Sequence, residues 1–100
     1  MDEELRKRYE EFFNDVVRRI GLNVRVVYTP DSDSDLHGEY LPNQNLIRIY
    51  DSDPDDAYRT LIHEIVEARI TPLINKYRVL VNKLIEFYER CLDIEKGIAG

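Results

Sequence analysis

The prediction of the fold starts from the stretch Thr60-Leu61-Ile62-His63-Glu64-Ile65-Val66-Glu67-Ala68-Arg69. Its apolar residues recur at steps of three and four, which is the pattern of an amphipathic helix. Capping residues precede Pro54 and two acidic residues follow it, so we expect a helix at residues 54–70. On that helix His63 and Glu67 lie one turn apart at the edge of the apolar stripe, with Glu64 beside them.

The rest of the chain is predicted to supply a sheet and two more helices. We expect a helix at residues 2–20, strands at residues 24–28, 38–41 and 46–50, and a last helix at residues 72–95. Turn-forming residues at 42–45 close a hairpin between the second and third strands. Pro72 disfavours a helical conformation at Thr71, so the last two helices are predicted to be separate. The sequence therefore predicts a single α+β domain over residues 1–100, with a three-stranded sheet against a helical layer.

The predicted core lies along apolar stripes of the helices. The stripe of the first helix is Leu5, Tyr9, Phe12, Phe13, Val16, Val17 and Ile20. The stripe of the helix at residues 54–70 is Tyr58, Leu61, Ile62, Ile65, Val66 and Arg69. The last helix has two apolar seams, which are Leu73, Tyr77, Leu80, Leu84, Tyr88 and Cys91, and Ile74, Val81, Ile85 and Leu92. One of these seams can be covered by the first helix or by a second copy of the chain, which makes a homodimer through this helix a hypothesis.

The composition argues against several classes of protein. A net charge of −6 does not attract phosphate backbones, so no nucleic-acid binding is expected. The apolar runs are too short to cross a bilayer and the acidic N-terminus is unlike a targeting peptide, so we expect a cytoplasmic protein without a membrane partner. Cys91 is the one cysteine, so neither an intrachain disulfide nor a cysteine zinc cluster can form.

His63, Glu64 and Glu67 form an H-E-x-x-E pattern on the predicted helix. Two ligands four residues apart on a helix point the same way, and a catalytic zinc site needs three protein ligands and one open position. Zinc is the expected metal, with His63 and Glu67 as ligands and Glu64 as the general base that takes a proton from water. The alternative interpretation is that the two glutamates are surface acids and that His63 pairs with Glu67.

The order of these motifs resembles the minimal zincin-like metallopeptidase domain, of the gluzincin type found in small archaeal and phage proteins. The resemblance covers residues 24–84. Its motifs are Thr29-Pro30 at the end of the first strand, Gly38-Glu39-Tyr40 and Leu46-Ile47-Arg48-Ile49 in the hairpin, Thr60-Leu61-Ile62-His63-Glu64 on the active-site helix and Leu80-Val81-Asn82-Lys83-Leu84 on the last helix. The resemblance implies that an extended peptide binds as an added strand at the sheet edge, along residues 46–50 or 39–41.

Two positions depart from the pattern of that family. Glu67 stands where the family has its second histidine, and Arg78 stands where the following helix usually supplies a third ligand. Because arginine stays protonated it cannot bind a cation, and it is expected to pair with Glu67 if the metal site has been lost. A different register makes Glu86 or Glu89 the third ligand.

Three hypotheses about function follow. The favoured one is a zincin-like protein that has lost catalysis and acts as a binding or regulatory module. The alternative is an active zinc-dependent peptidase with His63 and Glu67 as ligands, Glu86 as the candidate third ligand and Glu64 as the base. The third is a small helical adaptor in which the motif is coincidental.

Overall fold

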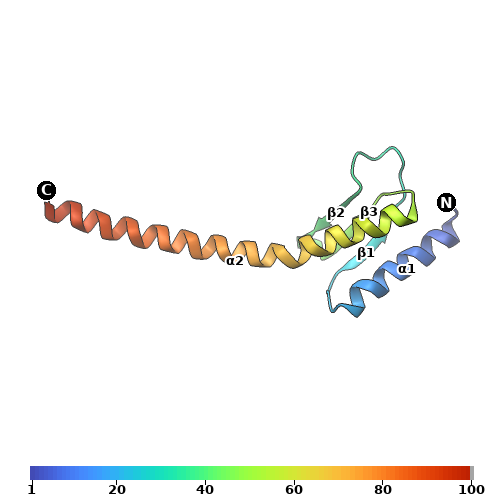
Figure 1. Cartoon of the computed structure of the whole chain (residues 1–100), viewed down its shortest axis with the longest axis horizontal. Coiled ribbons are helices and arrows are strands. Elements are labelled where there is room, and N and C mark those ends of the chain that lie inside the picture. The colour runs from blue at the N-terminus through green and yellow to red at the C-terminus, as the bar shows by residue number, and fades with distance from the viewer. Residues whose placement is uncertain (100) are drawn as a thin grey trace. The chain divides into compact units, whose positions relative to one another are not determined.

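The computed structural model describes the backbone of residues 1–99 and the side chains of residues 1–92. The elements are α1 (Glu3–Arg19), β1 (Arg25–Tyr28), β2 (Gly38–Leu41), a 3-10 turn (Pro42–Gln44), β3 (Leu46–Ile49) and α2 (Pro54–Ala99) (Figure 1). The predicted α+β layout, with an N-terminal helix, a three-stranded sheet and a long C-terminal helix, is confirmed. By its internal contacts the chain divides into two units, residues 1–69 and residues 70–100.

The sheet of the first unit is mixed, with β3 in the centre and the strand order β1-β3-β2. β3 runs parallel to β1 and antiparallel to β2, which confirms the predicted hairpin. Val26 lies opposite Ile47 and Tyr28 lies opposite Ile49, so these four apolar side chains point to one face of the sheet. This face carries the core, because all four side chains are buried.

The core is completed by the two helices, which both pack on that face. α1 contributes Phe13 and Val17, and the first part of α2 contributes Ala57 and Leu61. The stripe predicted for α1 is thus correct at its centre, with Tyr9 and Val16 packed at the rim. Its outer members, Leu5, Phe12 and Ile20, are exposed.

The ends of the helices are fixed by local hydrogen bonds. The carboxylate of Asp2 accepts from the backbone N–H of Leu5, and that of Asp53 accepts from the N–H groups of Asp55 and Asp56. Both caps satisfy first-turn donors that have no partner within the helix. Gly21 ends α1 with a φ of +72°, the left-handed conformation that glycine adopts at low cost.

The buried face of α2 differs from the predicted stripe. Buried positions of the first unit recur at Ala57, Leu61, Glu64 and Ala68. The predicted core positions Tyr58, Ile62 and Val66 are exposed, so this part of the prediction was wrong. Ala57 and Ala68 explain the difference, because their small side chains let the helix pack closely on the sheet. The prediction assigned the buried face to the large apolar residues and therefore gave the helix the wrong orientation. The consequence is that Glu64 faces inward.

The predicted break at Thr71–Pro72 was also wrong, because α2 continues through Pro72. Proline removes one N–H donor to the carbonyl four residues earlier, at a cost of roughly 3 kcal/mol, but it does not force a helix to end. The residue before proline has a statistical preference for extended conformation, and here the helical pattern on both sides outweighs it.

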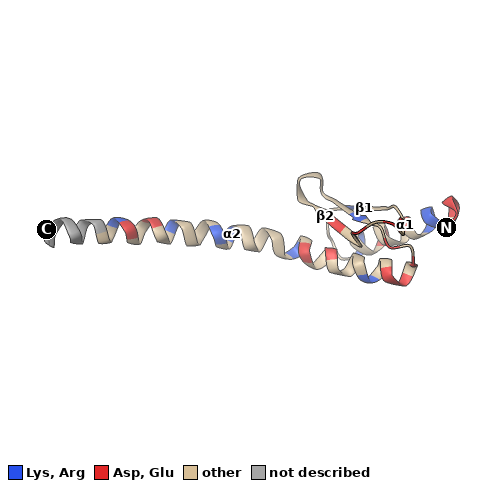
Figure 2. Ribbon diagram, turned by 90° about the horizontal axis from the view of Figure 1, so that it is seen from above, with Lys and Arg blue, Asp and Glu red and all other residues tan. Residues whose placement is uncertain are grey.

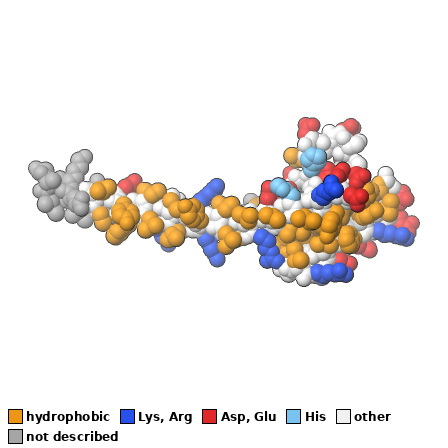
Figure 3. Space-filling view, viewed as in Figure 1, with side chains coloured by type: hydrophobic (Ala, Val, Ile, Leu, Met, Phe, Trp, Pro, Cys, Tyr) orange, Lys and Arg blue, Asp and Glu red, His pale blue; other side chains and the backbone are white. Residues whose placement is uncertain are grey.

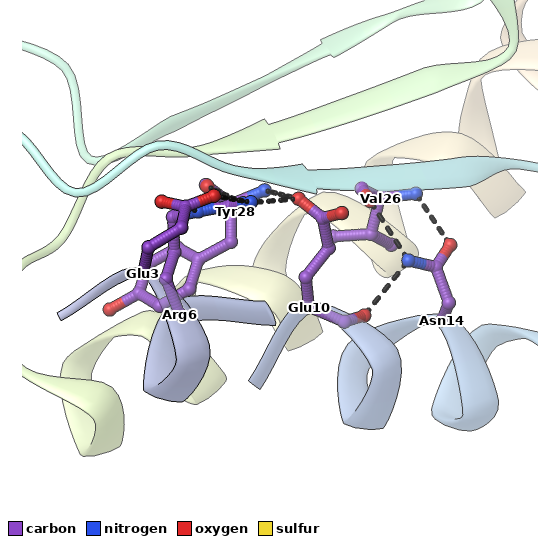
Figure 4. Close-up of polar contacts among 6 residues, drawn as sticks. All are labelled: Glu3, Arg6, Glu10, Asn14, Val26 and Tyr28. Atoms are coloured by element: carbon purple, nitrogen blue, oxygen red, sulfur yellow. Dashed lines mark hydrogen bonds and ion pairs between the residues drawn. The ribbon is translucent and has the colours of Figure 1, made fainter. Parts of the chain in front are cut away.

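β1 is an edge strand whose outward backbone groups bond to side chains of α1. Val26 exchanges two hydrogen bonds of 2.9 Å with the side chain of Asn14, one as donor and one as acceptor. The N–H of Tyr28 donates to Glu10 Oε2 at 3.0 Å, and the carbonyl of Tyr28 accepts from Arg6 at 3.0 Å (Figure 4). The side chains of α1 therefore close this edge of the sheet against a further strand.

Charge is unevenly distributed along the chain. Most acidic residues lie in the first unit, whereas the described side chains of the second unit include Lys76, Arg78, Lys83 and Arg90 against Glu86 and Glu89 (Figure 2). Among the described residues, no helix combines the length and apolar character needed to cross a bilayer.

Candidate metal centre

Three potential metal ligands converge on the first part of α2. His63, Glu64 and Glu67 each offer one donor atom, and these atoms all lie within 4.8 Å of one another. The helix brings them together because residues three and four positions apart are neighbours on its surface, and Glu64 and His63 stand three and four positions before Glu67. His63 Nε2 lies 3.1 Å from Glu67 Oε1, at hydrogen-bonding distance. The convergence predicted from the spacing is therefore present.

Glu64 is the buried member of this group. Its residue exposure is 5%, and its Oε2 atom is buried without a hydrogen-bond partner. Burial, and after it the negative charge of Glu67, raises the pKa of the Glu64 carboxyl to about 7. A buried carboxylate oxygen with no donor is costly, so this position favours either a proton or a cation beside it.

His63 and Glu67 form the outer part of the group. The side chain of His63 is 69% exposed and that of Glu67 is 52% exposed. The sequence placed both residues at the edge of the apolar stripe, bordering the core. That position was wrong, because both side chains are largely exposed to solvent. An ion bound here would be held by one inner carboxylate and two outer ligands, and it would be open to ligands from solvent.

A pocket of about 440 Å³ adjoins the group. It is lined by Asp35, Leu36, His37, Gly38, Arg59, Thr60, His63 and Glu64. Gly38 lets β2 lie close to α2 at this point, because a Cβ there would stand 2.5 Å from Thr60 Cγ2 and 2.9 Å from the Arg48 carbonyl oxygen. The same hypothetical atom would contact Glu64 Cγ at 3.7 Å, so the close approach also sets the space around the inner carboxylate.

A second histidine faces this pocket and is oriented by Asp51. His37 Nδ1 lies 2.6 Å from Asp51 Oδ1, and Thr60 Oγ1 donates to the other carboxylate oxygen of Asp51. The backbone carbonyl of Asp51 accepts from the hydroxyl of Tyr28 at 2.7 Å. The side chain of Asp51 is 10% exposed and that of His37 is 83% exposed. The hydrogen bond to Asp51 raises the pKa of His37.

The two histidines of the chain lie on one face of the first unit (Figure 3). The sequence did not single out His37 as a residue of the pocket, although it predicts a surface position that the exposed side chain confirms. Its position in a loop gave no periodicity to interpret, and its partner Asp51 lies after the next strand. A signal was present, because in the hairpin register His37 and Tyr50 stand opposite one another, which places residue 51 beside residue 37.

The third predicted ligand is not part of this group. Among the described residues the group contains His63, Glu64 and Glu67, whereas Glu86 forms a 3.9 Å ion pair with Arg90 in the second unit. The inner carboxylate of Glu64 is therefore the third donor that the structure places near the other two. The pairing of Glu67 with Arg78 stays a prediction.

The edge of the sheet next to the pocket is formed by β2. The N–H of Tyr50 donates to the carbonyl of His37 at 2.8 Å. Because hydrogen-bonded and non-hydrogen-bonded pairs alternate in an antiparallel ladder, the backbone groups of Gly38 and Tyr40 point away from β3. Of the two strands considered for peptide binding, β2 is the edge strand and β3 is central, so only β2 has a free side.

Comparison with protein-family models, with curated proteins and with solved structures finds no match for this chain. The resemblance to zincin-like metallopeptidases therefore stays a prediction, and the case for a metal centre rests on the geometry of the residues themselves.

Proposed function

We propose that the protein binds one divalent transition metal ion, zinc being the best suited, at His63, Glu64 and Glu67. The observation that carries this proposal is the buried, unpartnered Oε2 atom of Glu64 beside two further donor atoms. A cation at this point would compensate the carboxylate that the fold buries. One imidazole and two carboxylates are an acceptable ligand set for zinc, and they are also found around other first-row metals.

The pocket supports a hydrolytic activity on a peptide-like substrate. A bound zinc ion supplies Lewis-acid polarisation of a carbonyl oxygen and makes a nearby water more acidic. If the metal is held by His63 and Glu67 together with ligands from solvent, the Glu64 carboxylate beside them can accept the proton of an attacking water. His37, held by Asp51 on the pocket wall, can donate a hydrogen bond to the oxygen of the carbonyl under attack.

The second candidate is a binding module without catalysis, and the role of Glu64 separates the two functions. Among the described residues only three donors gather, so a metal that uses Glu64 as its third ligand leaves no carboxylate to act as base. The open side of β2 supports this candidate as well, because an extended peptide can add to a free edge strand without any chemistry.

Zinc competition against a chromophoric chelator tests the site. We expect stoichiometric binding by the native protein and a loss of affinity of at least about 100-fold in His63→Ala and in Glu67→Ala, as for removal of one ligand. Glu86→Gln serves as the matched control, because it removes a carboxylate from the same helix outside the group, and we expect it to bind zinc like the native protein.

Glu64→Gln distinguishes the two functions. If the variant keeps zinc and loses cleavage of an unstructured peptide mixture, Glu64 is the base and the protein is a peptidase. If the variant loses zinc, Glu64 is a ligand and the binding module is the better description. Absence of zinc binding by the native protein at saturating supply would contradict the proposed site, and unchanged affinity in His63→Ala would do the same.

A further inference from the structure

The second unit presents a large apolar surface on α2. The exposed large apolar side chains of residues 70–92 are Ile70, Leu73, Ile74, Tyr77, Val79, Leu80, Leu84, Ile85, Phe87, Tyr88 and Leu92. Figure 3 shows hydrophobic side chains along this part of the helix. Monomeric soluble proteins rarely expose contiguous apolar surface of this extent, so the surface indicates a binding partner.

The spacing of these residues indicates that the partner is another helix. Alternate steps of three and four lead through the a and d positions of a heptad repeat, which are Ile70, Leu73, Tyr77, Leu80, Leu84, Phe87 and Cys91. A repeat of 3.5 residues keeps one seam in contact with a partner helix that winds around it. A straight helix has 3.6 residues per turn and drifts away from such a seam, so a helix that lies on a sheet or a lipid surface has no need of the strict repeat.

The residues that flank the seam define the orientation of that partner. The g positions are Lys76, Lys83 and Arg90, and the e positions are Ile74, Val81 and Tyr88. In an antiparallel pair g positions lie near g positions, which would bring basic side chains together and cost free energy. In a parallel pair each g position faces an e position, so the aliphatic stem of a lysine covers an apolar side chain and its charge stays in water.

We propose that residues 70–92 of two copies of this chain form a parallel, in-register, two-stranded coiled coil. A second copy is the partner because it carries the same repeat in the same register. The basic g positions of each chain then face the apolar e positions of the other chain. The first heptad, with Ile70 at a and Leu73 at d, has the combination that favours two strands. This inference uses no residue of the metal centre and goes beyond the proposed function.

The register makes a specific prediction for Cys91, the one cysteine of the chain. In a parallel, in-register pair the two copies of an a position face each other across the seam, within the distance that a disulfide can bridge. In an antiparallel pair, Cys91 of one chain lies opposite residues near the start of the other helical segment. Diamide, acting as the oxidant of the two thiols, should therefore link two chains through Cys91 only if the pair is parallel.

The test compares two lysine substitutions on the full-length protein. Leu80→Lys places a charge at a d position, and Asn82→Lys places the same charge at the outer f position two residues later. In sedimentation equilibrium we expect a dimer for the native protein and for Asn82→Lys. For Leu80→Lys we expect a dissociation constant raised by at least about 1,000-fold, as the loss of two buried leucines per dimer predicts. As a control for folding, the NMR chemical shifts of the first unit in Leu80→Lys should equal those of the native protein.

Several results would overturn this proposal. A native protein that is monomeric at about 100 μM would do so, because a coiled coil of this length should associate at that concentration. Equal masses for Leu80→Lys and Asn82→Lys would place any dimer interface elsewhere. A dimer that diamide does not cross-link at Cys91 would exclude the parallel register. Co-sedimentation of monomeric protein with anionic vesicles would assign the apolar face to lipid instead.

Discussion

Glu64 shows how one residue couples the packing of the fold to its chemistry. It occupies the buried stripe of α2 between Leu61 and Ala68, where an apolar residue would pack without cost. Its Oε2 has no partner in the described chain, and burial raises its pKa to about 7. A folded state that holds an acid with a raised pKa binds protons more tightly than the unfolded state does. The metal-free protein should therefore lose stability as the pH rises from about 4.5 to about 7.

Glu64→Gln tests this effect in the metal-free protein. The variant has no charge to bury, so we expect its free energy of unfolding to exceed that of the native protein, with a gap that widens by on the order of 2 kcal/mol between pH 5 and pH 8. Urea denaturation in the presence of a chelator measures the gap. Glu11→Gln, at an exposed position of α1, should show no such change, and a gap that stays constant with pH would contradict the account of Glu64.

Gly38→Ala should destabilise the first unit. The added methyl group would clash with Thr60 Cγ2 and the Arg48 carbonyl oxygen, so we expect a loss of about 1–3 kcal/mol, as for overpacked sites. Thr60→Ser removes Cγ2 and keeps the hydroxyl that bonds to Asp51, so the double variant should recover part of the loss. Thermal denaturation of the three variants provides the comparison. If the two substitutions change the melting temperature additively, residues 38 and 60 do not contact each other, and the account of Gly38 is contradicted.

The pKa of His37 reports on the pocket. Asp51 raises it through a hydrogen bond and then through its charge, so Asp51→Asn should lower the pKa of His37. NMR titration of the His37 imidazole protons in metal-free native protein and in metal-free Asp51→Asn measures the change. An unchanged pKa for His37 in Asp51→Asn would mean that the two side chains do not pair in solution.

At the scale of elements, the edge of the sheet depends on α1. Asn14 bonds to both backbone groups of Val26, so Asn14→Leu leaves a donor and an acceptor without partners. We expect a loss of about 2–4 kcal/mol in the free energy of unfolding, measured by urea denaturation, because unpaired buried polar groups cost roughly 1–3 kcal/mol each. Asp15→Asn, at the next and exposed position, should change stability by less than about 0.5 kcal/mol. Equal losses in both variants would contradict the role of Asn14.

The sequence predicts most of the secondary structure of this chain because local chemistry determines it. Apolar spacing located α1, β-branched residues marked β1 and β3, and the capping residues before Pro54 marked a helix start that the structure confirms, with Asp53 as the cap. Pro72 misled the prediction because the preference of the residue before a proline is weaker than the helical pattern around it. The parallel pairing of β1 with β3 lies beyond local patterns, since those strands are neighbours only in space.

The candidate site was predictable where it lies on one helix and not where it depends on tertiary contacts. The spacing of His63, Glu64 and Glu67 was enough to predict their convergence. The inward orientation of Glu64 depends on Ala57 and Ala68, whose small size the stripe prediction undervalued.

At the scale of the whole molecule, the two units carry separate proposals. The metal centre uses residues of the first unit, and the coiled coil uses residues of the second. A monomeric protein can therefore still bind zinc, and a metal-free protein can still dimerise. Most acidic residues lie in the first unit, so the negative charge of the chain follows the same division (Figure 2).

X-ray absorption at the zinc edge tests the central claim most directly, because it reports the ligands of the bound metal. For zinc-loaded protein we predict a first shell of nitrogen and oxygen at about 2.0–2.2 Å, with the multiple scattering of one imidazole that disappears in His63→Ala. A shell with sulfur at about 2.3 Å would place the metal at Cys91, and a native spectrum without an imidazole signal would exclude His63; either result would contradict a centre built from His63, Glu64 and Glu67.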